Sequence, residues 1–298
     1  MIALNGAMVP LLEELLDAKR VTAAHLPHSL ATHGFLRGWA RLAAGESVAS
    51  VARTEVAAAV AGARLGALDA DHLQTLGLSG EEVCAVLRRS FDEVAAPLEP
   101  ELATHLRAAL APGAAAPTQV PAFAQQLARQ PRAGVTCPGR PRALLLPAEN
   151  HAEHCWAVAV MASLLAPVYG AEPAEAYWLG MVHHLHSAYM ADAGFSGEIM
   201  LGDRLDAVID SARGRALNEL PTALQGPAAA AQRLITNDEA PVAKAFHAAD
   251  VLDRVLEIRW HVSRGALTMT QVLNDYGLVH DGPVKGFHDE VLHQVGLL

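Results

Sequence analysis

Apolar and polar positions along this chain follow the spacing of helices. Alanine, leucine, glutamate and arginine dominate the sequence, and all four are strong helix formers. No convincing stretch alternates apolar and polar residues with a period of two, which is the pattern typical of a half-buried strand. The sequence therefore predicts an all-α protein without a sizeable sheet.

Several helix boundaries are marked by prolines and capping residues. Pro10 suits the first turn of one helix and Pro100 opens another. Ser79 and Glu82 have the spacing of a capping box ahead of an apolar run. The segment 239–264 has the pattern of one long helix, and the glycine that follows it is the expected stop.

A proline-rich segment divides the chain into two helical parts. Seven of the 17 prolines fall within 112–147, and a proline inside a helix costs about 3 kcal/mol. We therefore predict a connection over 112–141 that carries one short helix over 123–129. It separates an N-terminal helical region, 1–111, from a C-terminal domain, 142–298.

Composition and charge narrow the possible functions. The 298 residues are 52% apolar and 18% charged, with a formal net charge of −10. The high apolar fraction and low charged fraction exclude a disordered chain. The negative net charge argues against a nucleic-acid binder, which needs a basic surface. Three cysteines are too few for a disulfide framework, so we expect a cytoplasmic protein. We also expect no membrane span, since no run approaches about eighteen uncharged apolar residues.

Histidines are the residues whose placement indicates chemistry. The chain has 15, and five fall between His151 and His186. His154 heads an apolar stripe on a helix that begins near Glu149, so its side chain should point into the core. A buried imidazole that is neither hydrogen-bonded nor ligated costs about 1–3 kcal/mol. For a lone histidine, a satisfied core residue would be the simpler interpretation.

A second helix is expected to carry more histidines. His183 and His184 are adjacent in a segment that follows Pro173, and His186 comes two residues later. Adjacent helical residues diverge by about 100°, which can present two ligands to one metal ion. A solvated polar patch is the alternative, but leucine and tyrosine flank these histidines rather than lysine or glutamate.

A third element, the long helix, contributes His247 and Asp250. Their spacing of three places them on one face, in an apolar setting. A buried carboxylate needs a cation, a metal or hydrogen-bond donors. A salt bridge with Arg254 is one interpretation; we favour metal ligation, because the other histidines need an anionic partner. Several imidazoles with one carboxylate suit a divalent transition metal, namely Fe, Mn, Zn, Co or Ni.

These residues together resemble the HD superfamily of metal-dependent phosphohydrolases. That family has a histidine on one helix, a His-Asp doublet on the next, and a distant aspartate. His154, His183 and Asp250 correspond to three of those positions, and the resemblance covers about 140–264. It implies an HD-domain-like helical bundle, preceded here by the additional N-terminal helices.

One branch of the family, which hydrolyses deoxynucleoside monophosphates, is the most similar. The segment PAENHAEHCWAVAVMA looks like the opening of that branch's metal helix. In the branch, an arginine shortly before this segment helps to hold the phosphate, and Arg140 or Arg142 matches it. The resemblance therefore implies a small phosphorylated substrate.

Two positions depart from the family pattern. His184 replaces the aspartate of the doublet, and Ser187 stands where the monophosphatase branch has a general-acid glutamate. We take His154, His183, His184 and Asp250 as the metal ligands. The candidates for handling the proton are then Glu153, Asp192 and Glu198, the last two in a loop that we expect to lie over the metal. An ordinary connecting loop is the alternative.

Three functions are consistent with these residues. The first is a metal-dependent phosphohydrolase acting on a small phosphate ester or nucleotide, with Arg140 or Arg142 holding the phosphate. The second is a catalytically altered HD protein that senses a metal or ligand, since two acidic groups are missing. The third is an iron-dependent oxygenase of HD type. We expect no nucleic-acid or membrane partner, and a homodimer is a candidate assembly.

Overall fold

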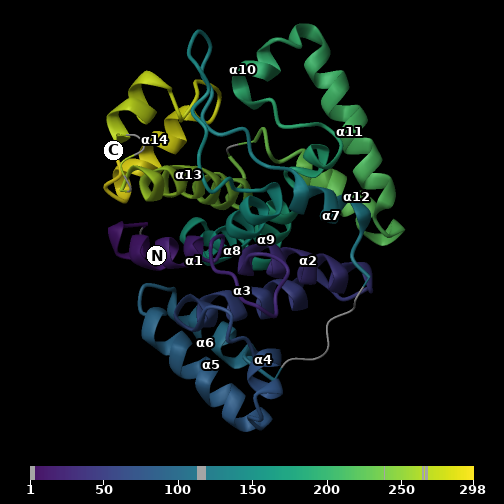
Figure 1. Ribbon diagram of the computed structural model, residues 1–298, viewed down its shortest axis with the longest axis vertical. Coiled ribbons are helices and arrows are strands. Elements are labelled where there is room, and N and C mark those ends of the chain that lie inside the picture. The colour runs from purple at the N-terminus through teal and green to yellow at the C-terminus, as the bar shows by residue number, and fades with distance from the viewer. Residues whose placement is uncertain (1–3, 113–118, 238, 264, 266–267) are drawn as a thin grey trace.

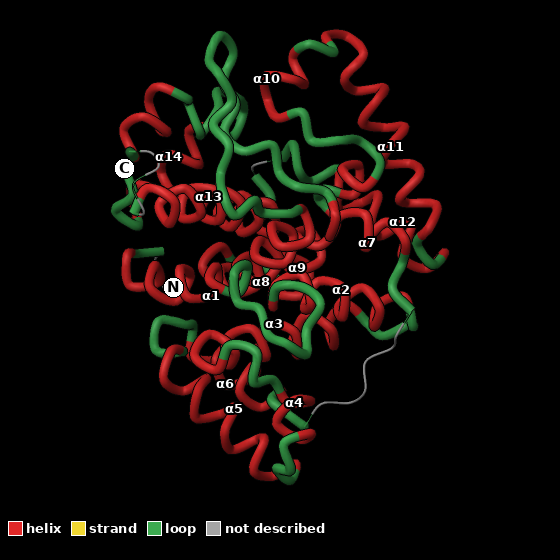
Figure 2. Tube along the Cα trace, viewed as in Figure 1, coloured by secondary structure: helices red, strands yellow, loops and turns green. Residues whose placement is uncertain are grey.

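The computed structural model describes residues 4–112, 119–237, 239–263, 265 and 268–298. Within these residues the named elements are all helices, and Figure 2 shows no strand among them. Two isolated β-bridges, Pro131 with Asn150 and Val135 with Ala143, join the connection to the chain that follows it. The prediction of an all-α fold is confirmed.

The N-terminal region contains six α-helices and a leading 3-10 turn among the described residues. They are η1 (Gly6–Met8), α1 (Val9–Asp17), α2 (Leu30–Ala43), α3 (Val48–Leu65), α4 (Ala70–Thr75), α5 (Gly80–Val94) and α6 (Pro100–Ala109). The capping box of Ser79 and Glu82 is present at the start of α5. Pro10 and Pro100 both lie in the first turn of their helices, as predicted.

The remaining helices lie within or after the proline-rich connection, of which 113–118 lie outside the described residues. They are α7 (Ala122–Arg129), α8 (His151–Tyr169), α9 (Pro173–Val182), η2 (Leu185–Ala188), α10 (Gly194–Ile199), η3 (Gly202–Arg204), α11 (Leu205–Glu219), α12 (Thr222–Gln232), α13 (Pro241–Val262), the π-helix η4 (Gln271–Asp275) and α14 (Lys285–Gln294). The short helix predicted inside the connection is α7. The long helix is α13, and Gly265 beyond it has a positive φ of 85°.

Helix α8 is the centre of the molecule. Every residue from His151 to Ala166 is buried. Figure 1 shows α8 and α9 in the middle, with α13 on one side and α2 and α3 on the other, and these helices are in contact. One hydrophobic cluster includes side chains from both predicted regions, such as Trp39 of α2 and Trp178 of α9. The N-terminal helices therefore complete the same core that holds the histidines.

Helix α8 also has the length and composition of a membrane span, contrary to the expectation that no segment would. Of its most apolar eighteen-residue window, 83% is buried inside the protein. A core helix of a soluble protein meets the same criteria, because a helix that is apolar on all sides needs partners on all sides. The surrounding helices supply those partners here.

The contact between α8 and α9 is set by a glycine. A Cβ atom added at Gly180 would lie 2.4 Å from the Cα of Ala159, well inside the distance of closest approach. The two backbones can meet only because neither residue carries a large side chain. This approach places the end of α9, with His183, beside the first turns of α8.

We predict that Gly180→Ala destabilises the protein by about 1–3 kcal/mol, because the added methyl group must push α8 and α9 apart. Urea unfolding followed by circular dichroism would measure the change. Gly214→Ala is the matched control, since Gly214 lies in α11 with open space around its Cα. That variant should be neutral or stabilising by up to about 1 kcal/mol. Equal effects of the two substitutions would contradict the tight approach.

Candidate metal centre

The first turn of α8 is held by a second capping box. The side chain of Asn150 accepts a hydrogen bond from the backbone N–H of Glu153 at 2.9 Å, and Glu153 accepts one from the backbone N–H of Asn150 at 2.8 Å. The other carboxylate oxygen of Glu153 accepts a hydrogen bond from the Ser29 hydroxyl at 2.5 Å. Burial raises the pKa of Glu153. Both oxygens of this predicted proton carrier are thus engaged at the junction of α8 with α2.

His154 and His183 meet at the centre of the molecule. Nδ1 of His154 donates to a carboxylate oxygen of Asp253 at 2.7 Å, and Nδ1 of His183 donates to the carbonyl of Gly180 at 2.7 Å. Each neutral ring therefore has a lone pair on Nε2. These two Nε2 atoms lie 3.0 Å apart.

Two lone pairs that face each other across 3.0 Å repel, unless a proton or a metal ion lies between them. Burial, with His154 beside it, holds the pKa of His183 well below its usual range, so His183 offers its lone pair as an acceptor or a ligand. Imidazole nitrogens about 2.0–2.1 Å from one ion would themselves lie roughly 3 Å apart. The buried pair therefore fits a transition metal.

The other two predicted ligands join this pair. His154, His183 and His184 can each direct one ligand atom into a cluster in which these atoms lie within 4.8 Å of one another. A carboxylate oxygen of Asp250 lies 3.4 Å from Nε2 of His154, and the other accepts a hydrogen bond from Arg254 at 2.8 Å. Asp250 thus forms the salt bridge with Arg254 and contacts His154, but the described groups that could share one ion are His154, His183 and His184, and Glu149, His154 and Asp253. Such buried groups could hold a metal ion.

The path of the chain through these histidines differs from the prediction. A single helix was expected to include His183, His184 and His186, but α9 ends at Val182. The carbonyl of Val182 accepts a hydrogen bond from the Gln232 side chain of α12 at 2.7 Å. Carbonyls at a helix end need such partners, and Gly180 receives one from His183. The turn that follows brings His184 back toward His154.

His186 and His247 do not join the cluster. His186 lies in η2, where burial lowers its pKa to about 4. His247 is buried on α13, with its ring 5.6 Å from the ring of His288. Neither belongs to a group of described residues that could hold a metal ion.

Sequence reasoning missed the charged groups behind His154. Nζ of Lys19 lies 2.6 Å from Asp253 and 3.5 Å from Glu257, and it also contacts Glu149. Burial opposes the charge of Lys19, but the three carboxylates together raise its pKa. Burial likewise opposes ionisation of Asp253, and Lys19 and His154 lower its pKa. The charged carboxylate fixes the tautomer of His154.

A cavity of about 470 Å³ borders this cluster. Its lining includes basic, imidazole and acidic side chains, namely Arg132, Arg142, Arg254, His151, His184, His186, Asp192, Glu198 and Asp253. The volume lies within the range of small-ligand sites. The lining carries three arginines and five acids, the latter including Glu149 and Glu257, so an anionic ligand would depend on direct contact with an arginine rather than on the charge of the whole cavity.

The predicted arginines occupy different positions relative to this cavity. Arg142 lines it and donates hydrogen bonds to the carbonyls of Ala133 and Ala193 at 3.2 and 3.0 Å. Arg140 is exposed and does not line it; its guanidinium lies 6.0 Å from the ring of Tyr276. Arg132, which sequence reasoning did not single out, reaches to 3.5 Å from Nε2 of His184. Only its position in the folded chain identifies it.

The acids of the predicted loop line the same cavity. Asp192 accepts hydrogen bonds from the backbone of Ala133 and Gly194 at 2.9 and 2.8 Å, and lies 3.3 Å from Nε2 of His151. Burial opposes its ionisation, but His151 and Arg132 lower its pKa. Glu198 differs, because burial and the charge of Asp192 both raise its pKa.

A comparison with known proteins identifies no relative: this chain matches no protein-family model, no curated protein and no solved structure. Membership of the HD superfamily therefore stays a prediction that rests on the residues named above.

We predict that the protein binds about one transition-metal ion per chain. Inductively coupled plasma mass spectrometry on protein purified without added metal would measure it. His154→Ala and His183→Ala should lose the ion, because each removes an imidazole from the cluster. His105→Ala, at an exposed position of α6, is the control and should retain it. Metal retained in both cluster variants would show that it binds elsewhere.

We also predict that Lys19→Met destabilises the protein by about 3–5 kcal/mol, because it leaves buried carboxylates without their cation. Metal affinity should fall about 10–100-fold, since Asp253 would no longer hold His154 firmly. Chemical unfolding and metal competition titration would measure the two effects. Lys285→Met removes the partly exposed pair with Asp289 and should cost at most about 0.5 kcal/mol. An unchanged metal affinity in Lys19→Met would remove the proposed link to His154.

Proposed function

We propose that this protein is a metal-dependent phosphohydrolase that acts on a small phosphate monoester, with a nucleoside monophosphate as the first candidate. One arrangement carries the proposal: the buried imidazole pair, with its two Nε2 atoms 3.0 Å apart, lies beside His184, which lines a cavity together with three arginines. The volume of about 470 Å³ is compatible with a nucleotide. The resemblance of the metal helix to the HD superfamily supports the same class of substrate.

The metal would be held by His154, His183, His184 and Asp250. When bound, a divalent transition metal supplies Lewis-acid stabilisation of a phosphate oxygen and lowers the pKa of a water ligand. The chain's own task is to keep these ligands in place. Asp253 and the carbonyl of Gly180 do so by fixing which nitrogen of each imidazole carries the proton.

Arg132 is the best candidate for holding the phosphate. Its side chain is largely buried, and it faces His184 at 3.5 Å and Asp192 at 3.9 Å. Guanidinium groups bind phosphate through forked N–H donors. Arg142 lines the same cavity, but two of its N–H groups already donate hydrogen bonds to backbone carbonyls. We assign Arg132 the principal contact and Arg142 the support of the cavity wall.

Glu198 is the best candidate for moving the proton. Burial and Asp192 raise its pKa, so this carboxyl group retains a proton more readily than an exposed one and can deliver it to a leaving oxygen. Glu153 and Asp192 have both of their oxygens engaged in hydrogen bonds. We assign these two residues to holding α8 and the cavity loop.

We expect the protein to release inorganic phosphate from at least one nucleoside monophosphate when supplied with Mn²⁺, Co²⁺, Fe²⁺, Ni²⁺ or Zn²⁺. Arg132→Ala should lower kcat/KM about 10²–10³-fold, since it removes charge opposite the phosphate. Arg140→Ala is the matched control and should leave kcat/KM within about twofold, because Arg140 does not line the cavity. Glu198→Gln should lower kcat about 10²–10⁴-fold. Colorimetric phosphate detection would measure all three.

The same experiment separates the alternatives. A sensor is the second candidate, because His184 stands in place of a carboxylate and most nearby acids are engaged in hydrogen bonds. Nucleotide binding without phosphate release from any substrate or metal would favour the sensor and reject the hydrolase. Substrate-dependent oxygen uptake by the iron-loaded protein would instead indicate an oxygenase.

A further inference from the structure

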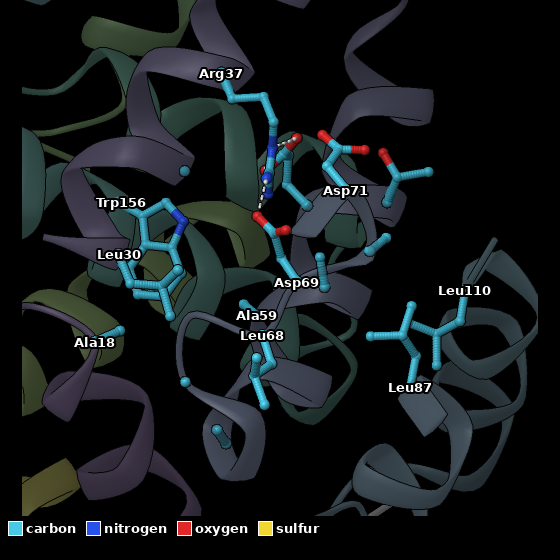
Figure 3. A pocket seen from close by; sticks show the side chains of 18 of the residues that line it. Ala18, Leu30, Arg37, Ala59, Leu68, Asp69, Asp71, Leu87, Leu110 and Trp156 are labelled. Atoms are coloured by element: carbon cyan, nitrogen blue, oxygen red, sulfur yellow. Dashed lines mark hydrogen bonds and ion pairs between the residues drawn. The ribbon is translucent and has the colours of Figure 1, made fainter. Parts of the chain in front are cut away.

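A second cavity, of about 510 Å³, lies in the N-terminal half between α1, α2, α3 and α5. Figure 3 shows its walls: Trp156 and Leu30 stand on one side, and Leu87 and Leu110 on the other. Arg37, Asp69 and Asp71 form a polar end between them. The metal candidates do not line this cavity, and it touches α8 only through Trp156.

Trp156 offers a hydrogen-bond donor to this cavity. The residue is only 3% exposed, and Figure 3 shows its indole nitrogen turned toward the interior of the cavity. That N–H makes no hydrogen bond with the described residues, although a buried indole usually finds an acceptor. Gly34 of α2 leaves room for the ring in this position, because a Cβ there would lie 2.4 Å from the indole nitrogen. A ligand in the cavity that carries an acceptor could satisfy this N–H.

The lining of this cavity as a whole holds more acids than arginines, although one acid, Glu14, is paired with Arg64 at 2.7 Å outside the lining. Its lining contains two arginines and six acids, namely Arg37, Arg41, Glu14, Asp17, Glu46, Glu55, Asp69 and Asp71. Both arginines are already paired: Arg37 binds Glu55 at 2.8 Å, and Arg41 binds Glu55 at 2.9 Å and Glu46 at 2.5 Å. An anionic ligand would therefore meet no available cation here.

Asp71 is the acid best placed to receive a cation. It makes no hydrogen bond and no ion pair with the described residues. Asp69 beside it caps α4 through the backbone N–H of His72 and lies 3.9 Å from Arg37. Figure 3 shows both carboxylates at the same end of the cavity. Together they give this end of the cavity a negative charge, with Asp71 exposed to solvent and Asp69 partly buried.

We propose that this cavity binds a small organic cation: a protonated amine joined to an apolar body that carries one hydrogen-bond acceptor. The amine lies against Asp71 and Asp69, the apolar body between Leu30 and Leu87, and the acceptor opposite the indole N–H of Trp156. The site is independent of the histidine cluster and of the reaction proposed for it.

The test uses isothermal titration calorimetry on the full chain with three probes that differ in charge. Procaine has a protonated tertiary amine, an aromatic ring and an ester carbonyl. Benzocaine keeps the ring and the ester but lacks the aliphatic amine, and phenylbutyrate is an anion. We expect saturable binding of procaine, at least tenfold weaker binding of benzocaine, and no binding of phenylbutyrate.

Two variants identify the site. Asp71→Asn should weaken procaine at least tenfold and leave benzocaine unchanged, because only the charge contact is lost. Trp156→Phe should weaken both probes by a similar factor, because both lose the indole donor. Glu101→Gln, at an exposed position of α6, is the matched control and should bind procaine as the parent protein does. Circular dichroism would verify that each variant is folded.

Three results would overturn the proposal. The first is the absence of saturable binding by procaine, and the second is binding of phenylbutyrate as tight as that of procaine. The third is binding of procaine that neither Asp71→Asn nor Trp156→Phe changes in folded protein. None of these results bears on phosphate release, so this site and the proposed hydrolysis succeed or fail separately.

Discussion

The orientation of His154 depends on a buried contact with Asp253, which in turn depends on the charge of Lys19. These groups lie on three helices or their ends: α8, α13 and the end of α1. Removed from water, a carboxylate needs both a cation and a hydrogen-bond donor, and here Lys19 supplies the first and His154 the second. The N-terminal region therefore helps to support the candidate metal centre, although none of its residues is a candidate ligand.

Close packing between α8 and α9 also positions the candidate metal centre. Gly180 lets α9 approach Ala159, and the end of α9 then delivers His183 opposite His154. The core has little freedom to adjust, because in close-packed protein interiors a small change in side-chain volume shifts the neighbouring side chains. A helix that is buried on every side can thus present different groups to different neighbours. His154 faces the histidine cluster, and Trp156, two residues later, faces the cavity against α2.

Much of the fold and part of the site could be predicted from local sequence. The helix starts near Pro10, Ser79 and Pro100 could be predicted from first-turn prolines and a capping residue, because these preferences act within one helical turn. The spacing of histidines on apolar helices indicated that His154 and Asp250 would face the core, and the structure places them 3.4 Å apart. Arg140 was selected by its place in the sequence alone, and the fold leaves it outside the cavity.

The sequence by itself determined the all-helical class and the apolar faces, because both follow from side-chain preferences over three or four neighbouring residues. Only the tertiary structure decided that α9 would end at Val182, since Gln232 of a later helix satisfies its last carbonyl. It also decided that Lys19 would stand behind His154 and that Arg132 would line the cavity. Contacts between residues 50 to 234 positions apart leave no local pattern, because they depend on how whole helices pack.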